Sequence, residues 1–76
     1  MKVKKNTAYK LDNGSFLTIR ACPEDANHKN EKLWCIVEIL THYADGRFVL
    51  KTTTMSVNEI RKAFHLKKGE YIEWQL

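Results

Sequence analysis

The sequence has few of the residues that mark the more specialised classes of small protein. Its 76 residues include only two cysteines, one proline and three glycines. So few cysteines exclude a scaffold held by several disulfides, and so little proline and glycine excludes a collagen-like chain or a flexible linker. No apolar run approaches the roughly 18 residues that a membrane-spanning helix needs. The chain is too short for two hydrophobic cores, so we expect a single domain over residues 1–76 with no membrane contact.

The composition is that of an ordinary folded domain. Hydrophobic residues make up 43% and charged residues 29% of the chain, far from the composition of a disordered segment. The first residues carry lysines, but no apolar stretch of a signal peptide follows them. We therefore expect a cytoplasmic protein whose two thiols are free and bind no metal. Cys35 falls within an apolar segment and should be buried, and Cys22 should lie near a strand end.

Positive charge is concentrated at the start of the chain. Residues 1–10 contain Lys2, Lys4, Lys5 and Lys10 but no acidic residue, whereas the rest of the chain has equal numbers of basic and acidic residues. The formal net charge of +4 is thus a property of the N-terminal segment. We interpret residues 1–6 as a basic tail, which either stays in solvent or attracts a polyanion.

Alternation of apolar and polar residues predicts five strands. Asn13-Gly14 and Asp45-Gly46 are strong hairpin-turn signals between such runs. Residues 32–43 are apolar at both odd and even positions, which is typical of a central strand covered on both faces. The predicted strands cover residues 7–11, 16–22, 32–43, 47–55 and 71–76.

One helix is predicted before the last strand. Ser56 and Glu59 have the spacing of a capping box, in which each side chain bonds the other residue's backbone N–H. Gly69 is expected to end the element, since glycine adopts the left-handed conformation common there. The helix from residue 57 to about 65 has one apolar stripe. This stripe consists of Val57, Ile60 and Phe64.

The element order is therefore β-β-β-β-α-β, which places the chain in the α+β class. Two architectures fit this order: a small SH3-like barrel, and an open antiparallel sheet with the helix packed on one face. The sequence alone does not decide between them.

No set of residues indicates catalysis or a cofactor. The glycines are too dispersed for a phosphate-binding loop, and no two carboxylates are placed together. The residues that most resemble metal ligands lack the closely spaced cysteine pair of a zinc site. We therefore expect no enzyme activity, no metal and no cofactor. The four residues considered as ligands are Cys22, His28, Cys35 and His42.

Residues 56–74 read SVNEIRKAFHLKKGEYIEW and resemble the helix and following strand of AbrB-type swapped-hairpin DNA-binding domains. The resemblance covers about a quarter of the chain, and Val57 stands where that family has a proline. It implies a DNA-binding regulator. The matching residues are Glu59, Ile60, Arg61, Leu66, Lys67, Gly69, Glu70 and Ile72.

Two functions fit these observations. The first is a small regulatory module that binds nucleic acid, with basic side chains on the phosphates. The alternative is an accessory or inhibitor protein, of the size common in phages and mobile elements, that occludes a surface of a larger protein. Homodimerisation is compatible with either. The candidate contact residues are Lys2, Lys4, Lys5, Lys10, Arg61, Lys62, Lys67 and Lys68.

Overall fold

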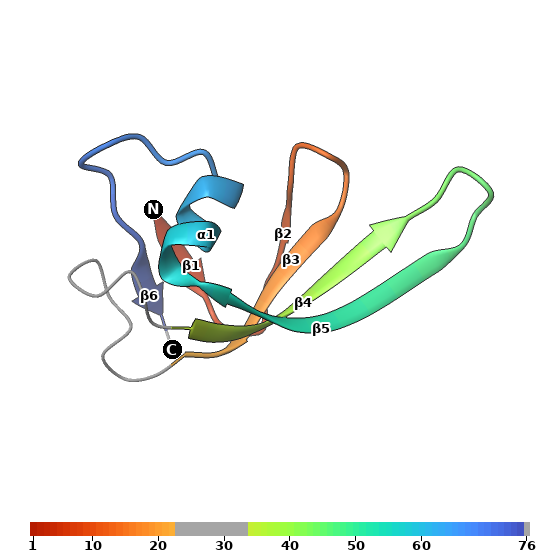
Figure 1. The fold of residues 1–76 in the computed structure, drawn as a ribbon, viewed down its shortest axis with the longest axis horizontal. Helices are drawn as coiled ribbons and strands as arrows, with labels where there is room; N and C mark the ends of the chain where they lie inside the picture. The colour runs from red at the N-terminus through yellow and green to blue at the C-terminus, as the bar shows by residue number, and fades with distance from the viewer. Residues whose placement is uncertain (23–33, 76) are drawn as a thin grey trace.

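The computed structural model describes residues 1–22 and 34–75. Within these residues it contains six strands and one short helix, which Figure 1 shows in chain order. The predicted α+β class, with a short helix before the last strand, is confirmed. The elements are β1 (Lys2–Lys4), β2 (Ala8–Lys10), β3 (Phe16–Ala21), β4 (Trp34–His42), β5 (Phe48–Ser56), α1 (Val57–Ala63) and β6 (Glu73–Gln75).

Four strands form an antiparallel sheet in the order β2-β3-β4-β5. Strands β2 and β5 are its edges among the described residues, so the sheet is open and not a closed barrel. Both predicted hairpin turns are confirmed. The Tyr43 N–H donates to the Arg47 carbonyl at 2.9 Å around the second turn. Gly46 has a φ of +86° there, which favours glycine.

The N-terminal segment belongs to the fold and is not the free tail that we predicted. Strand β1 pairs in parallel with β6, with Val3 opposite Trp74, and the Val3 side chain is fully buried. The Met1 ammonium group donates to the Tyr71 carbonyl at 2.9 Å. A single buried valine between exposed lysines is too weak a pattern to predict such a strand from the sequence.

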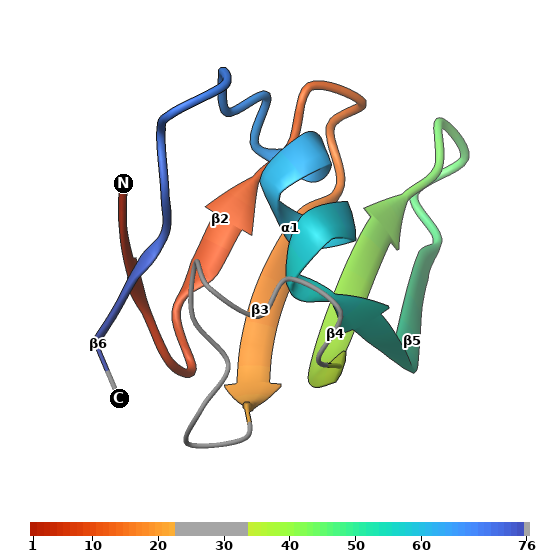
Figure 2. The same cartoon turned by 60° about the vertical axis from the view of Figure 1, so that its left-hand side comes forward.

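The core lies between the four-stranded sheet and α1, which covers one face of the sheet (Figure 2). Val57 and Ile60 are buried, as the apolar stripe predicts. Phe64 is half-buried and meets the Tyr9 ring edge-on, with 5.7 Å between ring centroids. The core is made of Val3, Leu17, Ile19, Cys35, Val37, Val57, Ile60 and Ile72.

The helix begins where predicted but ends earlier. Ser56 is the N-cap, and its hydroxyl accepts from the Glu59 N–H at 3.1 Å. His65, with a φ of +56°, takes the left-handed position after the helix that we assigned to Gly69. The Leu66 N–H then donates to the Arg61 carbonyl at 3.1 Å, which closes the helix end.

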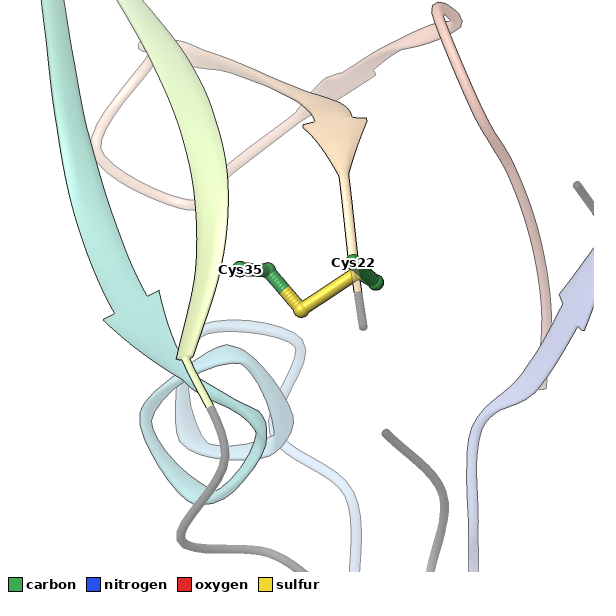
Figure 3. The surroundings of a disulfide bond; sticks show 2 residues. All are labelled: Cys22 and Cys35. Atoms are coloured by element: carbon green, nitrogen blue, oxygen red, sulfur yellow. A yellow bond between two sulfur atoms is a disulfide. The ribbon is translucent and has the colours of Figure 1, made fainter. Parts of the chain in front are cut away.

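The prediction of free thiols is wrong: Cys22 and Cys35 form a disulfide (Figure 3). Cys22 directly follows β3, and Cys35 lies near the start of β4 on the buried face. Strands β3 and β4 are neighbours in the sheet, so their pairing brings the two residues together across 13 positions of sequence. Residue spacing alone does not reveal which cysteines pair, and residues 23–33, with the candidate ligand His28, lie outside the described part of the chain.

Strand β4 is covered on only one of its two faces, contrary to the prediction. Cys35 and Val37, on the face toward α1, are fully buried. On the opposite face, Trp34 is 55% exposed and Ile36 is 47% exposed. The second apolar face of β4 therefore lies at the surface. Figure 1 shows the β4–β5 hairpin extending away from β1 and β6, along the longest dimension of the molecule.

In the described residues, no helix has the length and apolar character needed to cross a membrane.

Candidate nucleic-acid interface

Four of the predicted contact residues come from α1 and the segment after it. Because Val57 and Ile60 direct one helix face into the core, Arg61 and Lys62 lie on other faces, where Lys62 is exposed and Arg61 half-buried. Lys67 and Lys68 follow in the connection to β6, and both are exposed. The helix and its connection therefore present these cations at one end of the molecule.

Arg61 holds this connection in place. Its Nη2 atom donates to the Glu70 carbonyl at 2.8 Å and to the Lys67 carbonyl at 3.3 Å. The guanidinium carbon lies 5.5 Å from the centroid of the Tyr71 ring, a cation–π distance. We predicted Arg61 as a phosphate contact, but its hydrogen bonds are directed into the protein. Its positive charge still adds to the electrostatic potential of this surface. Its hydrogen bonds fix the segment that carries Lys67 and Lys68 to the helix.

A shallow hollow of about 380 Å³ lies between α1 and this segment. Its lining combines three cationic side chains with one aromatic ring, one amide and the apolar side chain of Leu66. Asn58 and Tyr71 were not among the predicted contact residues, although the position of Asn58 off the apolar stripe of the helix is visible in the sequence. The lining residues are Asn58, Arg61, Lys62, Leu66, Lys68, Gly69 and Tyr71.

The parallel pairing of β1 and β6 brings the N-terminus to the same place. The Met1 ammonium group bonds the carbonyl of Tyr71, a residue that lines the hollow. Lys2 is the next residue, is exposed, and lies opposite Glu73 on β6. We call the resulting surface the basic end. It consists of the N-terminal ammonium group, Lys2, Arg61, Lys62, Lys67 and Lys68.

The remaining predicted lysines do not join this group. Lys4 and Lys5 lie farther along the N-terminal segment beside Gln75, whose carbonyl accepts from the Lys5 N–H at 3.2 Å. Lys10 is on β2 opposite Phe16. Because Tyr9 contacts the helix side through Phe64, the alternation of the strand places Lys10 on the other face of the sheet.

Three carboxylates lie near the basic end and reduce its potential. Glu59 is in the first helical turn, Glu73 lies across from Lys2, and the Glu70 carboxylate accepts from the Lys67 N–H at 3.1 Å. The cations outnumber these acids, and Glu70 is held against the backbone. The surface as a whole is therefore positive, although only moderately so.

No arrangement for metal chemistry accompanies the hollow: within residues 1–22 and 34–75, no group of three or more histidine, cysteine, aspartate or glutamate side chains could hold a metal ion. Cys22 and Cys35 are joined to each other, and His42 lies at the far end of β4. A scan of protein-family models, a search of curated proteins and a search of solved structures give no match to this chain.

Proposed function

We propose that the protein is a small non-enzymatic regulatory module that binds nucleic acid through its basic end. The observation that carries this proposal is the convergence of two basic segments that lie at opposite ends of the sequence. Met1 and Lys2 come beside the segment of Lys67 and Lys68 through the pairing of β1 with β6. A field built from several cations at one end attracts a polyanion more strongly than the same charges dispersed over the surface.

The lysines serve as phosphate contacts in this proposal, and Arg61 serves as the residue that positions them. Lys62 and Lys68 both line the hollow, whose volume is about 380 Å³, so both ammonium groups can approach one phosphate group there. Tyr71 is 44% exposed and lies beside the Arg61 guanidinium, so it adds an aromatic group to the cationic lining of the hollow. Such contacts recognise the backbone and not the sequence, so the binding is salt-dependent and largely indifferent to base order.

Two expectations from the sequence belong to this proposal. The resemblance of residues 56–74 to AbrB-type domains supports DNA as the nucleic acid, since the segment that carries it also carries most of the basic end. The second, a cytoplasmic location, rested on free thiols, and the Cys22–Cys35 disulfide speaks against it, because the cytoplasm keeps thiols reduced. Labelling of thiols in intact cells decides the matter: labelled cysteines would support the cytoplasmic location, and unlabelled cysteines would exclude it.

The decisive experiment compares two variants with equal changes in net charge. The first replaces Lys62, Lys67 and Lys68 of the basic end with glutamate. The control makes the same change at Lys10, Arg47 and Lys51, which are exposed and lie outside the basic end. Each protein is titrated against duplex DNA, single-stranded DNA and RNA at several salt concentrations.

We expect the first variant to lose most of the affinity, with the slope of log K against log salt flattened by roughly 0.7–0.9 for each phosphate that is no longer neutralised. The control variant should retain most of the affinity, and its slope of log K against log salt should stay close to that of the unmodified protein. Equal losses in the two variants would reduce the interaction to nonspecific attraction by net charge. No binding by the unmodified protein at low salt would exclude the proposal.

A second candidate function has an observation of its own. An accessory or inhibitor protein needs a surface that docks on a larger protein, and the exposed apolar face of β4 has the required character. Affinity purification from the native host, with and without nuclease treatment, separates the two functions. Recovery of one protein in both arms favours the second, and nuclease-sensitive recovery of nucleic acid favours the first.

A further inference from the structure

The hollow beside α1 is lined by positive charge alone. Three of its side chains, those of Arg61, Lys62 and Lys68, are cationic, and among the described residues none that lines it is acidic. The carboxylate of Glu70, on the same segment, accepts from the Lys67 N–H at 3.1 Å and is not part of the lining. The hollow is therefore more positive than the basic end as a whole, because the carboxylates of that surface lie outside it.

Two parts of the fold hold these cations around one space. Arg61 and Lys62 belong to α1, whose opposite face is buried in the core. Lys68 belongs to the connection between α1 and β6, and Arg61 joins this connection to the helix by donating to two of its backbone carbonyls. Like charges are thus kept close together by the protein itself, and an anion that enters the hollow relieves their mutual repulsion.

The charge of the hollow discriminates between two kinds of phosphate group. An internal phosphate of a nucleic-acid strand is a diester and carries one negative charge. A terminal phosphate is a monoester, which carries about 1.5–2 negative charges at pH 7 and has three acceptor oxygens. Because Coulomb attraction increases with the charge of the ligand, several neighbouring cations favour the monoester.

The position of the hollow favours the end of a strand over its middle. Figure 1 shows α1 and the connection to β6 at the end of the molecule opposite the tip of the β4–β5 hairpin. A strand that lies along a protein presents a charge about every 3.4 Å of its axis, which a row of cations would match. Here the cations are clustered at one end of the molecule, and Lys10 lies on the other face of the sheet. A cluster of this kind matches a single, more highly charged group.

We propose that the hollow binds the terminal phosphate of a nucleic-acid strand, with the Lys62 and Lys68 ammonium groups at its oxygens and Arg61 adding its charge beside them. This inference rests on the proposed function and names the part of the nucleic acid that the basic end recognises. Lys2 and Lys67, which lie outside the hollow, then attract the neighbouring internal phosphates. A free mononucleotide carries the same phosphomonoester, so the experiment has to separate it from a strand end.

The test compares one single-stranded DNA in three forms. One form has hydroxyl groups at both ends, and the other two carry a phosphate on the first or on the last nucleotide. Fluorescence anisotropy, with the dye on an internal base, measures the dissociation constant of each form at one salt concentration. Competition with a nucleoside monophosphate and with the corresponding nucleoside measures the binding of the free ligands.

Two double variants with equal changes in net charge locate the effect. Lys62→Gln with Lys68→Gln removes both lysines of the hollow. Lys2→Gln with Lys67→Gln removes two lysines of the basic end that do not line the hollow. All of these side chains are exposed, so both variants should keep the fold, which circular dichroism and urea unfolding check.

We expect the unmodified protein to prefer a phosphorylated strand over the hydroxyl-ended strand by roughly tenfold, because about one more charge meets several cations near the protein surface. The variant of the hollow should lower this preference to about twofold, whereas the control variant should keep it while binding every form more weakly. Equal affinity for all three forms, each of them bound, would overturn this inference and leave the proposed function in place. Failure of every form to bind would overturn both.

The variants and the free ligands supply the remaining outcomes. A preference that the two double variants lose equally would overturn the assignment to the hollow. We expect the nucleoside monophosphate to compete more weakly than the phosphorylated strand, and the nucleoside not to compete. A monophosphate that binds more tightly than the phosphorylated strand would assign the hollow to a free nucleotide and would overturn the proposal of a strand end.

Discussion

At the residue scale, Arg61 and Arg20 each link two parts of the chain through the hydrogen bonds that their guanidinium groups donate. The Arg61 guanidinium joins the carbonyls of Lys67 and Glu70 to the helix. Arg20 joins Glu38 on β4 to Asn6 near β1. Arg20 uses two nitrogens of its planar guanidinium, one for each acceptor, whereas both hydrogen bonds of Arg61 come from Nη2 while the guanidinium lies against the Tyr71 ring.

Replacing Arg61 with lysine should separate charge from geometry. The variant keeps the positive charge but loses the planar guanidinium that lies against the Tyr71 ring and directs Nη2 to both carbonyls, so we expect the free energy of unfolding to fall by about 1–2 kcal/mol. Urea denaturation monitored by fluorescence measures this change. The salt slope of nucleic-acid binding should stay the same. A large loss of affinity with unchanged stability would instead show that Arg61 touches the ligand.

The Arg20–Glu38 pair predicts how stability depends on pH. Because Arg20 lowers the pKa of Glu38 below its ordinary value of 4.5, the ionised carboxylate stabilises the folded state. This contribution is complete above the unfolded-state pKa and is lost as the pH falls through the lower folded-state pKa. The unmodified protein should therefore be more stable than Glu38→Gln at pH 7, and the two should converge in acid.

Unfolding curves for the two proteins from pH 7 to pH 2, at concentrations where both are single chains, provide the measurement. A difference in stability that persists unchanged below the folded-state pKa would contradict the role assigned to the ion pair.

At the scale of the elements, the disulfide fastens β3 to β4 on the buried side of the sheet. Closing a loop of this length stabilises a fold by about 3 kcal/mol, mainly by restricting the unfolded chain. We expect a reducing agent to lower the free energy of unfolding of the unmodified protein by about 3 kcal/mol. The matched control is the double variant Cys22→Ala, Cys35→Ala, which should already be less stable and should not respond to the reducing agent.

Elements with long, regular patterns could be predicted from the sequence, and the shortest ones could not. Strand β4 and its hairpin partner β5 have nine residues each and a glycine-containing turn between them, so alternation and turn chemistry suffice to locate them. Strands β1 and β6 have only three residues each and pair across almost the whole chain. No local pattern specifies such a partner, because the pairing depends on how the rest of the domain folds.

The same distinction between local and long-range patterns applies to the candidate site. Lys62, Lys67 and Lys68 were predictable, since they lie off the apolar stripe or beyond the helix. Their proximity to Met1 and Lys2 was not, because it follows from the β1–β6 pairing. The disulfide was missed for a related reason: the apolar context of Cys35 indicates burial but does not reveal that Cys22 is its neighbour.

At the scale of the whole molecule, the N-terminal segment pairs with the last strand and contributes Val3 to the core. Deleting residues 1–5 removes β1 and the fully buried Val3, and burial of that one side chain alone is worth about 1.5–3 kcal/mol. We therefore expect the deletion to destabilise the domain by at least this amount in thermal and urea unfolding. Replacing the exposed Lys2, Lys4 and Lys5 with alanine removes the same charges while the strand remains.

The alanine variant should unfold within about 1 kcal/mol of the unmodified protein, as expected for surface positions. If the deletion and the alanine variant were equally stable, Val3 would contribute nothing to the core.

The parallel pairing of the first and last strands also has a mechanical consequence. In parallel strands the start of β1 and the end of β6 point in opposite directions, so a force pulling the two chain ends apart acts along the strands. The hydrogen bonds from Glu73 to Met1 and from Lys5 to Gln75 must then give way together, in shear. An antiparallel pair at the termini would instead open one bond at a time. The β4–β5 hairpin is an antiparallel pair of this second kind, so the molecule should resist stretching through its termini more than peeling apart of that hairpin.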